Sequence, residues 1–275
     1  MHPDELTPDA LRAALAASQR HVAEMAAAQD EFLRAVSHDL RAPLRHVTSF
    51  GALVREVLSD LPADVGTRPE IQEAQQFLDT MDQSARRMGH MLDGLLAIAR
   101  AGQSPLRPAP VPLAQAVPQA QEQAQEQTVA KQVPPAGLNA ATRATPQWHV
   151  APDLPVLQAD AALLHDLLVH LLGNALKFSR NAAPPVIAIA PVPAPPGQVA
   201  FTIEDNGVGF DPARAGQLFG VFQRLHRESD FEGVGAGLAL CRLIAKRHGG
   251  EVTATARPGA GCTVRVQWPA VAPGA

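Results

Sequence analysis

The chain has 275 residues, of which 46% are hydrophobic and 18% are charged, and this balance predicts a globular protein of two ordinary domains. Its formal net charge of −4, without any cluster of Lys and Arg, argues against direct binding to nucleic acid or to an anionic membrane. The sequence holds no long apolar run, no secretory signal pattern and only two cysteines, Cys241 and Cys262, so we expect a cytoplasmic protein with reduced thiols and no membrane segment.

Heptad spacing predicts one long helix at the N-terminus. Thr7-Pro8-Asp9 supplies an N-cap, a proline at the first helical position and an acidic first turn. Apolar or small residues then recur in steps of three and four as far as Val57, which is typical of a coiled-coil seam. We assign residues 1–30 to an N-terminal coiled-coil helix.

The seam is interrupted near its middle. An extra step of four between Val36 and Leu40 is a stutter, which locally unwinds a coiled coil. Pro43 has no amide hydrogen and makes no bond to the carbonyl of Asp39, so we expect a kink close to His38.

A second seam follows a turn-rich stretch at residues 61–66. It runs from Ile71 to Leu95 in alternating steps of three and four. Two antiparallel helices with wide apolar faces do not bury those faces alone. We therefore predict that residues 31–102 form a helical hairpin and that two chains join as a homodimer with a four-helix bundle.

The remaining chain predicts an α/β sandwich. A Pro-rich linker at 103–111 precedes a domain at 112–269, and a tail at 270–275 follows it. Helices are predicted over about 112–130, Asp160–Phe178 and Leu238–His248, and strands over Val186–Ala190, Val199–Glu204, Val252–Ala256 and Thr263–Gln267. The last two strands form a hairpin through residues 257–261, so the fold class is α+β with a mixed, largely antiparallel sheet.

His38 is the first candidate for chemistry. It lies two residues from Val36 and two from Leu40, so at about 100° per residue its side chain points away from the seam into solvent. Asp39 can hydrogen-bond one ring nitrogen, which leaves the other nitrogen as a nucleophile able to receive a phosphoryl group. The alternative is an ordinary solvated histidine beside a surface aspartate.

A second set of candidates suits a nucleotide. Asn174 and Lys177 are three apart on one predicted helix and share a face, where an amide oxygen suits Mg²⁺ and an ammonium suits phosphate. Asp205 ends a strand and precedes Gly207 and Gly209, so its carboxylate can accept the adenine amino hydrogen while the glycines permit a close backbone approach. A polar helix face and an ordinary turn are the alternative interpretations.

A glycine-rich segment opens the last predicted helix. Gly233, Gly235, Gly237 and Leu238 place backbone amides at a helix N-terminus, where amides can donate to phosphate. The sequence has neither the directly preceding strand that a dinucleotide-binding unit requires nor a Gly-Lys-Ser/Thr motif. These absences separate the segment from the Rossmann and P-loop types of phosphate site.

One string resembles the phosphoacceptor region of sensor histidine kinases, including the phytochrome-like branch, namely Ser37-His38-Asp39-Leu40-Arg41-Ala42-Pro43-Leu44. The later motifs occur in the order of the Bergerat-type ATP-binding fold, and the resemblance covers residues 30–268. It implies that Phe219, Phe222 and Arg224 belong to a mobile lid over ATP, between Gly209 and Gly233. It also implies that Thr263 belongs to the terminal glycine-rich turn of the ATP site.

This resemblance implies a function. ATP-dependent autophosphorylation of His38, with Asp39 as the base, precedes transfer of the phosphate to an aspartate of a response regulator, and Mg²⁺ accompanies ATP. The implied partners are a second copy of the chain, the receiver domain of the response regulator and an upstream sensor protein. Two alternatives stay open, namely a non-catalytic dimeric ATP-binding signalling scaffold and a Bergerat-type ATPase.

Two residues depart from the family pattern. Ala42 stands four residues after the acceptor, where relatives with strong phosphatase activity usually have Thr or Asn, so we expect weak phosphatase activity. His170 stands four residues before Asn174, where ATP-hydrolysing relatives carry Glu and histidine kinases usually carry Asn. Without the Glu, we expect phosphate transfer to protein rather than efficient ATP hydrolysis.

Overall fold

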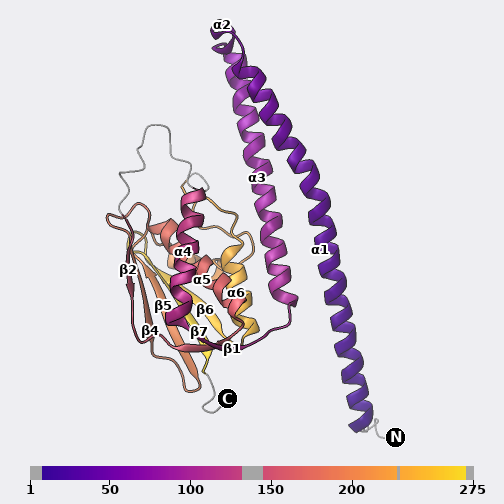
Figure 1. The fold of residues 1–275 in the computed structure, drawn as a ribbon, viewed down its shortest axis with the longest axis vertical. Coiled ribbons are helices and arrows are strands. Elements are labelled where there is room, and N and C mark those ends of the chain that lie inside the picture. Colours follow the sequence, from indigo (N-terminus) through magenta and orange to yellow (C-terminus); the bar gives the residue numbers. More distant parts are fainter. Residues whose placement is uncertain (1–7, 132–144, 228–229, 271–275) are drawn as a thin grey trace. The chain divides into compact units, whose positions relative to one another are not determined.

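A computed structural model describes residues 8–131, 145–227 and 230–270 of the chain (Figure 1). The chain divides into two compact units, Met1–Gln103 and Ser104–Ala275. Thr7, the predicted N-cap, lies outside the described residues. Within the described ranges, no helix is both long enough and apolar enough to cross a lipid bilayer.

The first unit is a helical hairpin, as its two seams predict. It consists of α1 (Pro8–Ser59), the short α2 (Ala63–Gly66) and α3 (Pro69–Gln103). α1 and α3 lie side by side, and α1 extends beyond the end of α3 (Figure 1). α1 is continuous through Pro43, so the proline removes one backbone hydrogen bond without ending the helix.

Ion pairs and small side chains hold α1 against α3. Arg41 donates to Asp93 at 2.6 Å and Arg55 donates to Asp79 at 2.8 Å, and each pair joins the two helices. These groups are largely exposed, so each pair contributes at most about 1 kcal/mol. The buried residues among the described side chains of this unit are few and mostly small: Ser37, Gly51, Ala85, Leu96 and Ala101.

Large apolar side chains of both helices stay exposed in the single chain. Members of both predicted seams are among them, and Phe50 is 64% exposed. In the described part of this unit they are Leu15, Met25, Leu40, Val47, Phe50, Leu53, Val54, Val57, Phe77, Met81 and Met88. One hairpin therefore leaves its own apolar seams in contact with water.

The second unit contains a five-stranded sheet with the order β2-β4-β5-β7-β6. Its strands are β2 (Gln147–Val150), β4 (Val186–Val192), β5 (Gln198–Asp205), β6 (Glu251–Ala256) and β7 (Cys262–Pro269). β2 pairs with β4 in parallel, and the other neighbours pair antiparallel. The mixed, largely antiparallel sheet and the hairpin of β6 and β7 are thus confirmed.

The sequence does not predict a further, two-stranded sheet. β1 (Ala109–Pro112) pairs antiparallel with β3 (Val156–Ala159), so the segment predicted as a linker over 103–111 contains most of a strand. Pro110 and Pro112 conceal this strand, because proline lacks an amide donor and is tolerated only where a sheet does not need one. β2 and β3 are only four residues each, which is too short for a clear alternation pattern.

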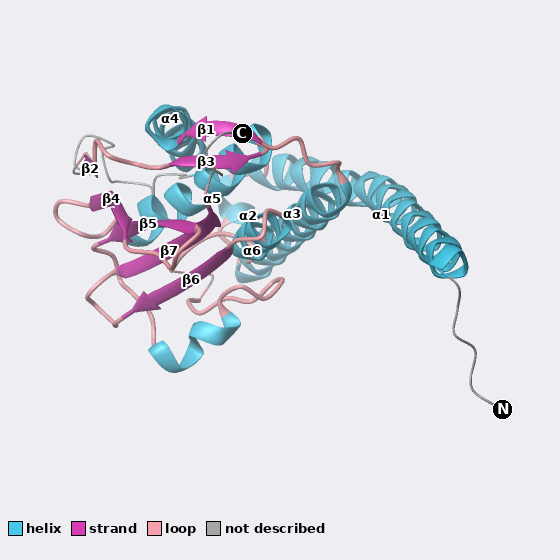
Figure 2. Cartoon of the chain, turned by 90° about the horizontal axis from the view of Figure 1, so that it is seen from below, coloured by secondary structure: helices cyan, strands magenta, loops and turns pink. Residues whose placement is uncertain are grey.

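Helices cover one face of the five-stranded sheet. α5 (Ala161–Ser179) and α6 (Gly237–Arg247) pack on the strands, and α4 (Leu113–Lys131) packs on α5 (Figure 2). A short 3₁₀ helix covers Pro212–Gln217. The three predicted helices of this unit are confirmed, with bounds close to the predicted ones.

The core of this unit lies between α5 and the sheet. An apolar face of α5 supplies five buried leucines: Leu164, Leu167, Leu168, Leu171 and Leu172. Phe201 on β5 and Trp268 on β7 are also fully buried, so each removes a large apolar surface from water. Cys241 is buried and Cys262 is half-buried, and both are free thiols.

Leu168→Ala should destabilise the second unit by about 2–5 kcal/mol, because it removes buried methyl groups and leaves a cavity beside the sheet. Leu163→Ala is the matched control. Leu163 is only half-buried on the same helix, so its substitution should lower the free energy of unfolding by less. Urea unfolding followed by tryptophan fluorescence measures the difference, because Trp148 and Trp268 both lie in this unit. Equal losses for the two variants would contradict the assigned core.

Candidate functional site

His38 and Asp39 form the first part of the site, on the exposed side of α1. Nδ1 of His38 lies 3.2 Å from Oδ1 of Asp39, and the two side chains are 87% and 80% exposed. The preceding Ser37 is only 3% exposed, so the change from the buried to the exposed side of α1 falls between Ser37 and His38. A carboxylate at Nδ1 favours the tautomer with hydrogen on that nitrogen, which leaves the lone pair of Nε2 available as a nucleophile.

Ala42 lies one turn after His38 and is half-buried. Its methyl group has neither a donor nor an acceptor, so it does not orient a water molecule beside the imidazole. Arg41 is engaged with Asp93 of α3. Asp39 is therefore the polar side chain that contacts the ring in the described structure.

Asp205 stands at the C-terminal end of β5, and its side chain is partly buried. Oδ1 of Asp205 accepts a hydrogen bond from the backbone N–H of Gly207 at 2.9 Å. Burial raises the pKa of Asp205 to about 6, although backbone hydrogen bonds from Gly207 and Cys262 act in the opposite direction. The carboxyl group is thus a fixed acceptor for a polar hydrogen of a ligand.

Two backbone hydrogen bonds fasten the loop after Asp205. The amide of Val208 donates to the carbonyl of Phe178 at 3.2 Å, and the amide of Gly259 donates to the carbonyl of Val208 at 2.8 Å. The loop therefore joins the C-terminal end of α5 to the turn between β6 and β7.

Gly207 and Gly209 make this close approach possible. A β-carbon at Gly207 would collide with the carbonyl oxygen of Phe178, and one at Gly209 would collide with that of Arg257. Gly209 also has a φ of 59°, which residues with a side chain rarely adopt. Backbone packing therefore requires both of the glycines that the sequence predicts beside Asp205.

Asn174 and Lys177 are half-buried on the C-terminal part of α5. Nζ of Lys177 donates to the carbonyl of Glu232 at 3.3 Å and lies 4.2 Å from the ring centroid of Phe178. This contact brings the end of the predicted lid to the lysine that is predicted to bind phosphate. Gly233 follows with a φ of 115°, so the backbone turns there in a conformation that favours glycine.

The glycine-rich segment contacts both the predicted lid and α5. The amide of Phe222 donates to the carbonyl of Gly235 at 2.9 Å. Gly237 begins α6, and a β-carbon there would lie 3.1 Å from Nδ1 of His170. His170 is therefore packed against the first turn of α6, where Leu238 follows as a half-buried residue.

The strand register separates Thr263 from the other predicted residues. Thr263 pairs with Glu204, whereas Cys262 pairs with Asp205. Opposite residues of an antiparallel pair share a face and adjacent residues alternate, so Cys262 rather than Thr263 lies on the side of Asp205. Burial, reinforced by the nearby carboxylate of Asp205, raises the pKa of Cys262 to about 12.

Phe219 and Arg224 are members of the predicted lid. Phe219 is half-buried, and Arg224 donates through Nη2 to the carbonyl of Phe231 at 2.6 Å.

Two further residues, Arg180 and Glu232, carry no sequence signal. They form an ion pair at 2.6 Å. They lie 52 residues apart, and no local motif links them.

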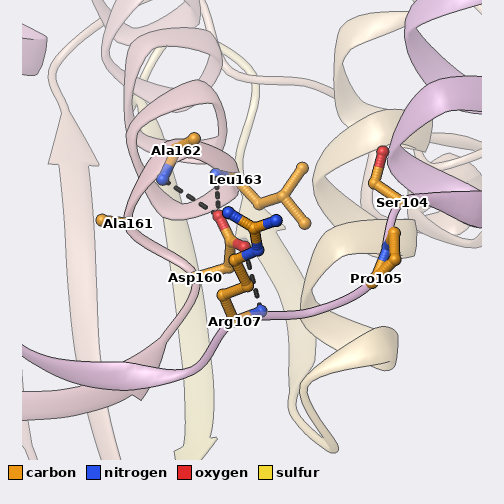
Figure 3. Close-up of a pocket in the computed structure, with 7 residues that line it drawn as sticks. All are labelled: Ser104, Pro105, Arg107, Asp160, Ala161, Ala162 and Leu163. Carbon is orange, nitrogen blue, oxygen red and sulfur yellow. Dashed lines mark hydrogen bonds between the residues drawn. The ribbon is translucent and has the colours of Figure 1, made fainter.

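A hollow of about 500 Å³ lies at the opposite end of α5 (Figure 3). Its lining residues are Ser104, Pro105, Arg107, Asp160, Ala161, Ala162 and Leu163. Asp160 caps α5 there by accepting hydrogen bonds from the amides of Ala162 at 3.1 Å and Leu163 at 3.2 Å. Asn174 lies about three turns further along α5, roughly 16 Å away, so the hollow is separate from the predicted nucleotide residues.

The residues present fit a Mg²⁺ ion that is held mainly by a nucleotide. Among the described residues, no group of three or more His, Cys, Asp and Glu side chains is arranged to hold a metal ion. Mg²⁺ typically binds one or two protein oxygens together with substrate phosphates and water. The amide oxygen of Asn174 suits that limited role.

Two family models match the chain. The His Kinase A (phospho-acceptor) domain matches residues 28–104. The family described as histidine kinase-, DNA gyrase B-, and HSP90-like ATPase matches residues 159–272. His38 falls in the first match, and Asn174, Lys177 and Asp205 fall in the second.

Individual proteins are similar over most of the chain. The methanogenesis regulatory histidine kinase FilI of Methanothrix harundinacea is 27% identical over 238 residues, which are 86% of this chain and 24% of FilI. The adaptive-response sensory kinase SasA of Thermosynechococcus vestitus is 27% identical over 241 residues, which are 87% of this chain and 60% of SasA. The chain therefore spans less than two thirds of the length of these relatives.

A solved structure shares the fold. Full-length ShkA in complex with AMPPNP is similar with a TM-score of 0.56 and 24% identity. The similarity covers 88% of this chain and 46% of that chain.

The raised pKa of Asp205 predicts a pH-dependent stability. The folded protein holds a proton on Asp205 more tightly than the unfolded chain does, so this contribution to stability is fully present below about pH 4 and is lost as the pH rises through about 6. The unfolding free energy of the wild type, minus that of Asp205→Asn, should therefore fall by up to about 3 kcal/mol between pH 4 and pH 7. Urea titrations across this range measure it, and parallel pH profiles for the two proteins would refute the assignment.

Proposed function

Because the chain belongs to the sensor histidine kinases, we propose that it uses ATP to phosphorylate its own His38. The phosphoryl group then passes to an aspartate in the receiver domain of a response regulator. The observation that carries this proposal is the exposed pair of His38 and Asp39, in which the carboxylate at Nδ1 favours the tautomer that leaves Nε2 free to attack phosphorus. The fixed carboxylate of Asp205, with the close backbone approach at Gly207 and Gly209, supports the proposal at the nucleotide end.

The proposed reaction is an in-line displacement at the γ-phosphorus of ATP. The lone pair of Nε2 of His38 forms the new N–P bond while the bond to the bridging oxygen breaks, and ADP leaves with that electron pair. The ring becomes cationic as the bond forms, so Asp39 stabilises the proton on Nδ1 and then accepts it. The products are ADP and a phosphohistidine.

Each polar residue of the nucleotide half has a separate task. The carboxylate of Asp205 accepts the adenine amino hydrogen, on the face that it shares with Cys262. Lys177 places its ammonium on phosphate oxygens, which replace the Glu232 carbonyl as its partner. Asn174 would hold Mg²⁺ through its amide oxygen, and the ion would supply charge neutralisation at the phosphates.

The lid and the glycine-rich segment complete the phosphate side. Gly233, Gly235 and Gly237 offer backbone amides near the N-terminus of α6, where the helix dipole favours negative charge. Phe219 and Phe222 belong to the segment that closes over ATP and excludes water.

We propose that a second copy of the chain covers the exposed apolar seams of α1 and α3. Burying a large side chain such as Phe50 contributes about 1.5–3 kcal/mol, so a four-helix bundle made from two hairpins gains from several such residues. The segment predicted as an N-terminal coiled coil, of which residues 8–30 are described as helix, would receive the signal from an upstream sensor. An enzyme that consumes ATP works where ATP is supplied, so we assign the chain to the cytoplasm.

His170 favours a kinase over a Bergerat-type ATPase. His170 stands four residues before Asn174, at the position where an ATPase of this superfamily needs a carboxylate to activate water. Its ring packs against Gly237. The scaffold alternative differs from both, because it predicts ATP binding without any transfer.

Incubation with γ-labelled ATP and Mg²⁺ should place an acid-labile, base-stable phosphate on the wild type. His38→Gln should remove this label completely, because the substituted amide has no nucleophilic ring nitrogen. His46→Gln is the matched control, since His46 is an exposed histidine on the same helix and should label like the wild type. Label-free protein that still binds ATP would favour the scaffold, and free phosphate without labelled protein would favour the ATPase.

Phe50→Glu should weaken the homodimer at least about tenfold, because each chain would then bury a carboxylate in the bundle. Sedimentation equilibrium of the full chain measures the dissociation constant. Arg45→Glu adds a negative charge at an exposed polar position of α1 and should leave dimerisation nearly unchanged. A monomeric wild type, or equal effects of both substitutions, would contradict the predicted interface.

A further inference from the structure

Arg180, the first residue after α5, contacts three consecutive residues at the C-terminal end of the lid. Its Nη1 pairs with Oε2 of Glu232 at 2.6 Å, and its Nη2 donates to the carbonyl of Asp230. Its guanidinium carbon lies 4.8 Å from the ring centroid of Phe231. One side chain thus holds residues 230–232 through a carboxylate, a carbonyl and an aromatic face, a combination that the planar guanidinium group suits well.

The middle contact is supported by packed rings. Phe231 is only 5% exposed, and its ring centroid lies 5.0 Å from that of Phe178 and 5.3 Å from that of His226. The rings of Phe178 and His226 are also 5.3 Å apart, so the three rings form a closed triangle. Tilted rings at these separations attract one another. The lid is therefore anchored to the end of α5 on its apolar side as well as by Arg180.

Hydrogen bonds and surrounding charges favour the ionised form of the carboxylate in the ion pair. Burial acts to raise the pKa of Glu232, but hydrogen bonds from its own backbone amide and from Arg180, together with the charges of Arg180 and Lys177, hold its pKa below the usual value. The side chains of Arg180 and Glu232 are 25% and 37% exposed, so water screens the pair only in part.

The anchored segment also reaches the lysine at the phosphate end of the site. The carbonyl of Glu232, whose side chain Arg180 holds, accepts the hydrogen bond from Nζ of Lys177. The position of residues 230–232 therefore sets the distance between the lid and Lys177.

We propose that Arg180 is a positioning residue for nucleotide binding, which fastens the C-terminal end of the lid to α5 and keeps that end beside Lys177. This inference rests on the proposed function, because it takes ATP as the ligand of Lys177. When ATP enters, Lys177 exchanges the Glu232 carbonyl for a phosphate oxygen, while Arg180 keeps the lid end in place. The lid then closes from a fixed end rather than from a free loop.

Three variants of the full chain test this inference. Arg180→Ala removes all three contacts, Glu232→Gln removes only the carboxylate, and Arg242→Ala is the control, because Arg242 is an exposed arginine on α6. Hydrogen exchange of the amides at 230–233 without nucleotide reports the anchoring directly. Autophosphorylation at varied ATP concentrations gives KM for ATP and the rate at saturating ATP.

Arg180→Ala should accelerate exchange at 230–233 and raise KM about tenfold, with the saturated rate changed by less than about twofold. Glu232→Gln should show smaller changes in the same direction, and Arg242→Ala should match the wild type. This split between KM and rate distinguishes positioning from a general loss of folding.

Unchanged exchange in Arg180→Ala would overturn the anchoring, whatever the protein does with ATP. Faster exchange with an unchanged or lower KM would overturn the role in nucleotide binding. A wild type that binds no ATP would instead refute the proposed function, and the exchange comparison would still decide whether Arg180 holds the lid.

Discussion

The backbone hydrogen bond from Val208 to Phe178 is the contact on which the nucleotide half of this protein depends. It ties the C-terminal end of α5 to the loop after β5, so that Lys177 and Asp205 border the same loop. The bond forms only because Gly207 carries no β-carbon at the point of closest approach. The buried leucine face of α5 fixes the orientation of this helix about its own axis. The polar side chains therefore owe their positions to apolar packing and one main-chain contact, not to attraction between one another.

The sequence predicts what is periodic or local and misses what depends on register or on distant contacts. The heptad seams and the leucine face of α5 are regular over many turns, so these helices follow from spacing alone. β1 is hidden by its prolines, and the choice between Cys262 and Thr263 depends on pairing with β5, which spacing along one strand does not determine. The pair of Arg180 and Glu232 belongs to the same class, since only the folded chain brings it together.

The two halves of the proposed chemistry lie in opposite electrostatic environments. His38 and Asp39 are open to water, which keeps their interaction weak and the imidazole accessible to a second protein. Asp205 is partly withdrawn from water, so each hydrogen bond that it makes to a ligand is stronger and more selective. The proposed phosphoacceptor is thus exposed, whereas the carboxylate proposed to bind adenine is partly buried.

α1 is longer than α3, so α3 packs along only part of its length. Its 52 residues span about 78 Å as an α-helix, whereas the 35 residues of α3 span about 52 Å. Roughly the first third of α1 therefore extends past α3, and it exposes Leu15 and Met25. Because α3 does not pack on this stretch, its helicity rests on propagation from the rest of α1 rather than on burial of its apolar residues. The helix–coil equilibrium of this stretch is then set by whatever packs against it, so that helix formation and association become one thermodynamic event.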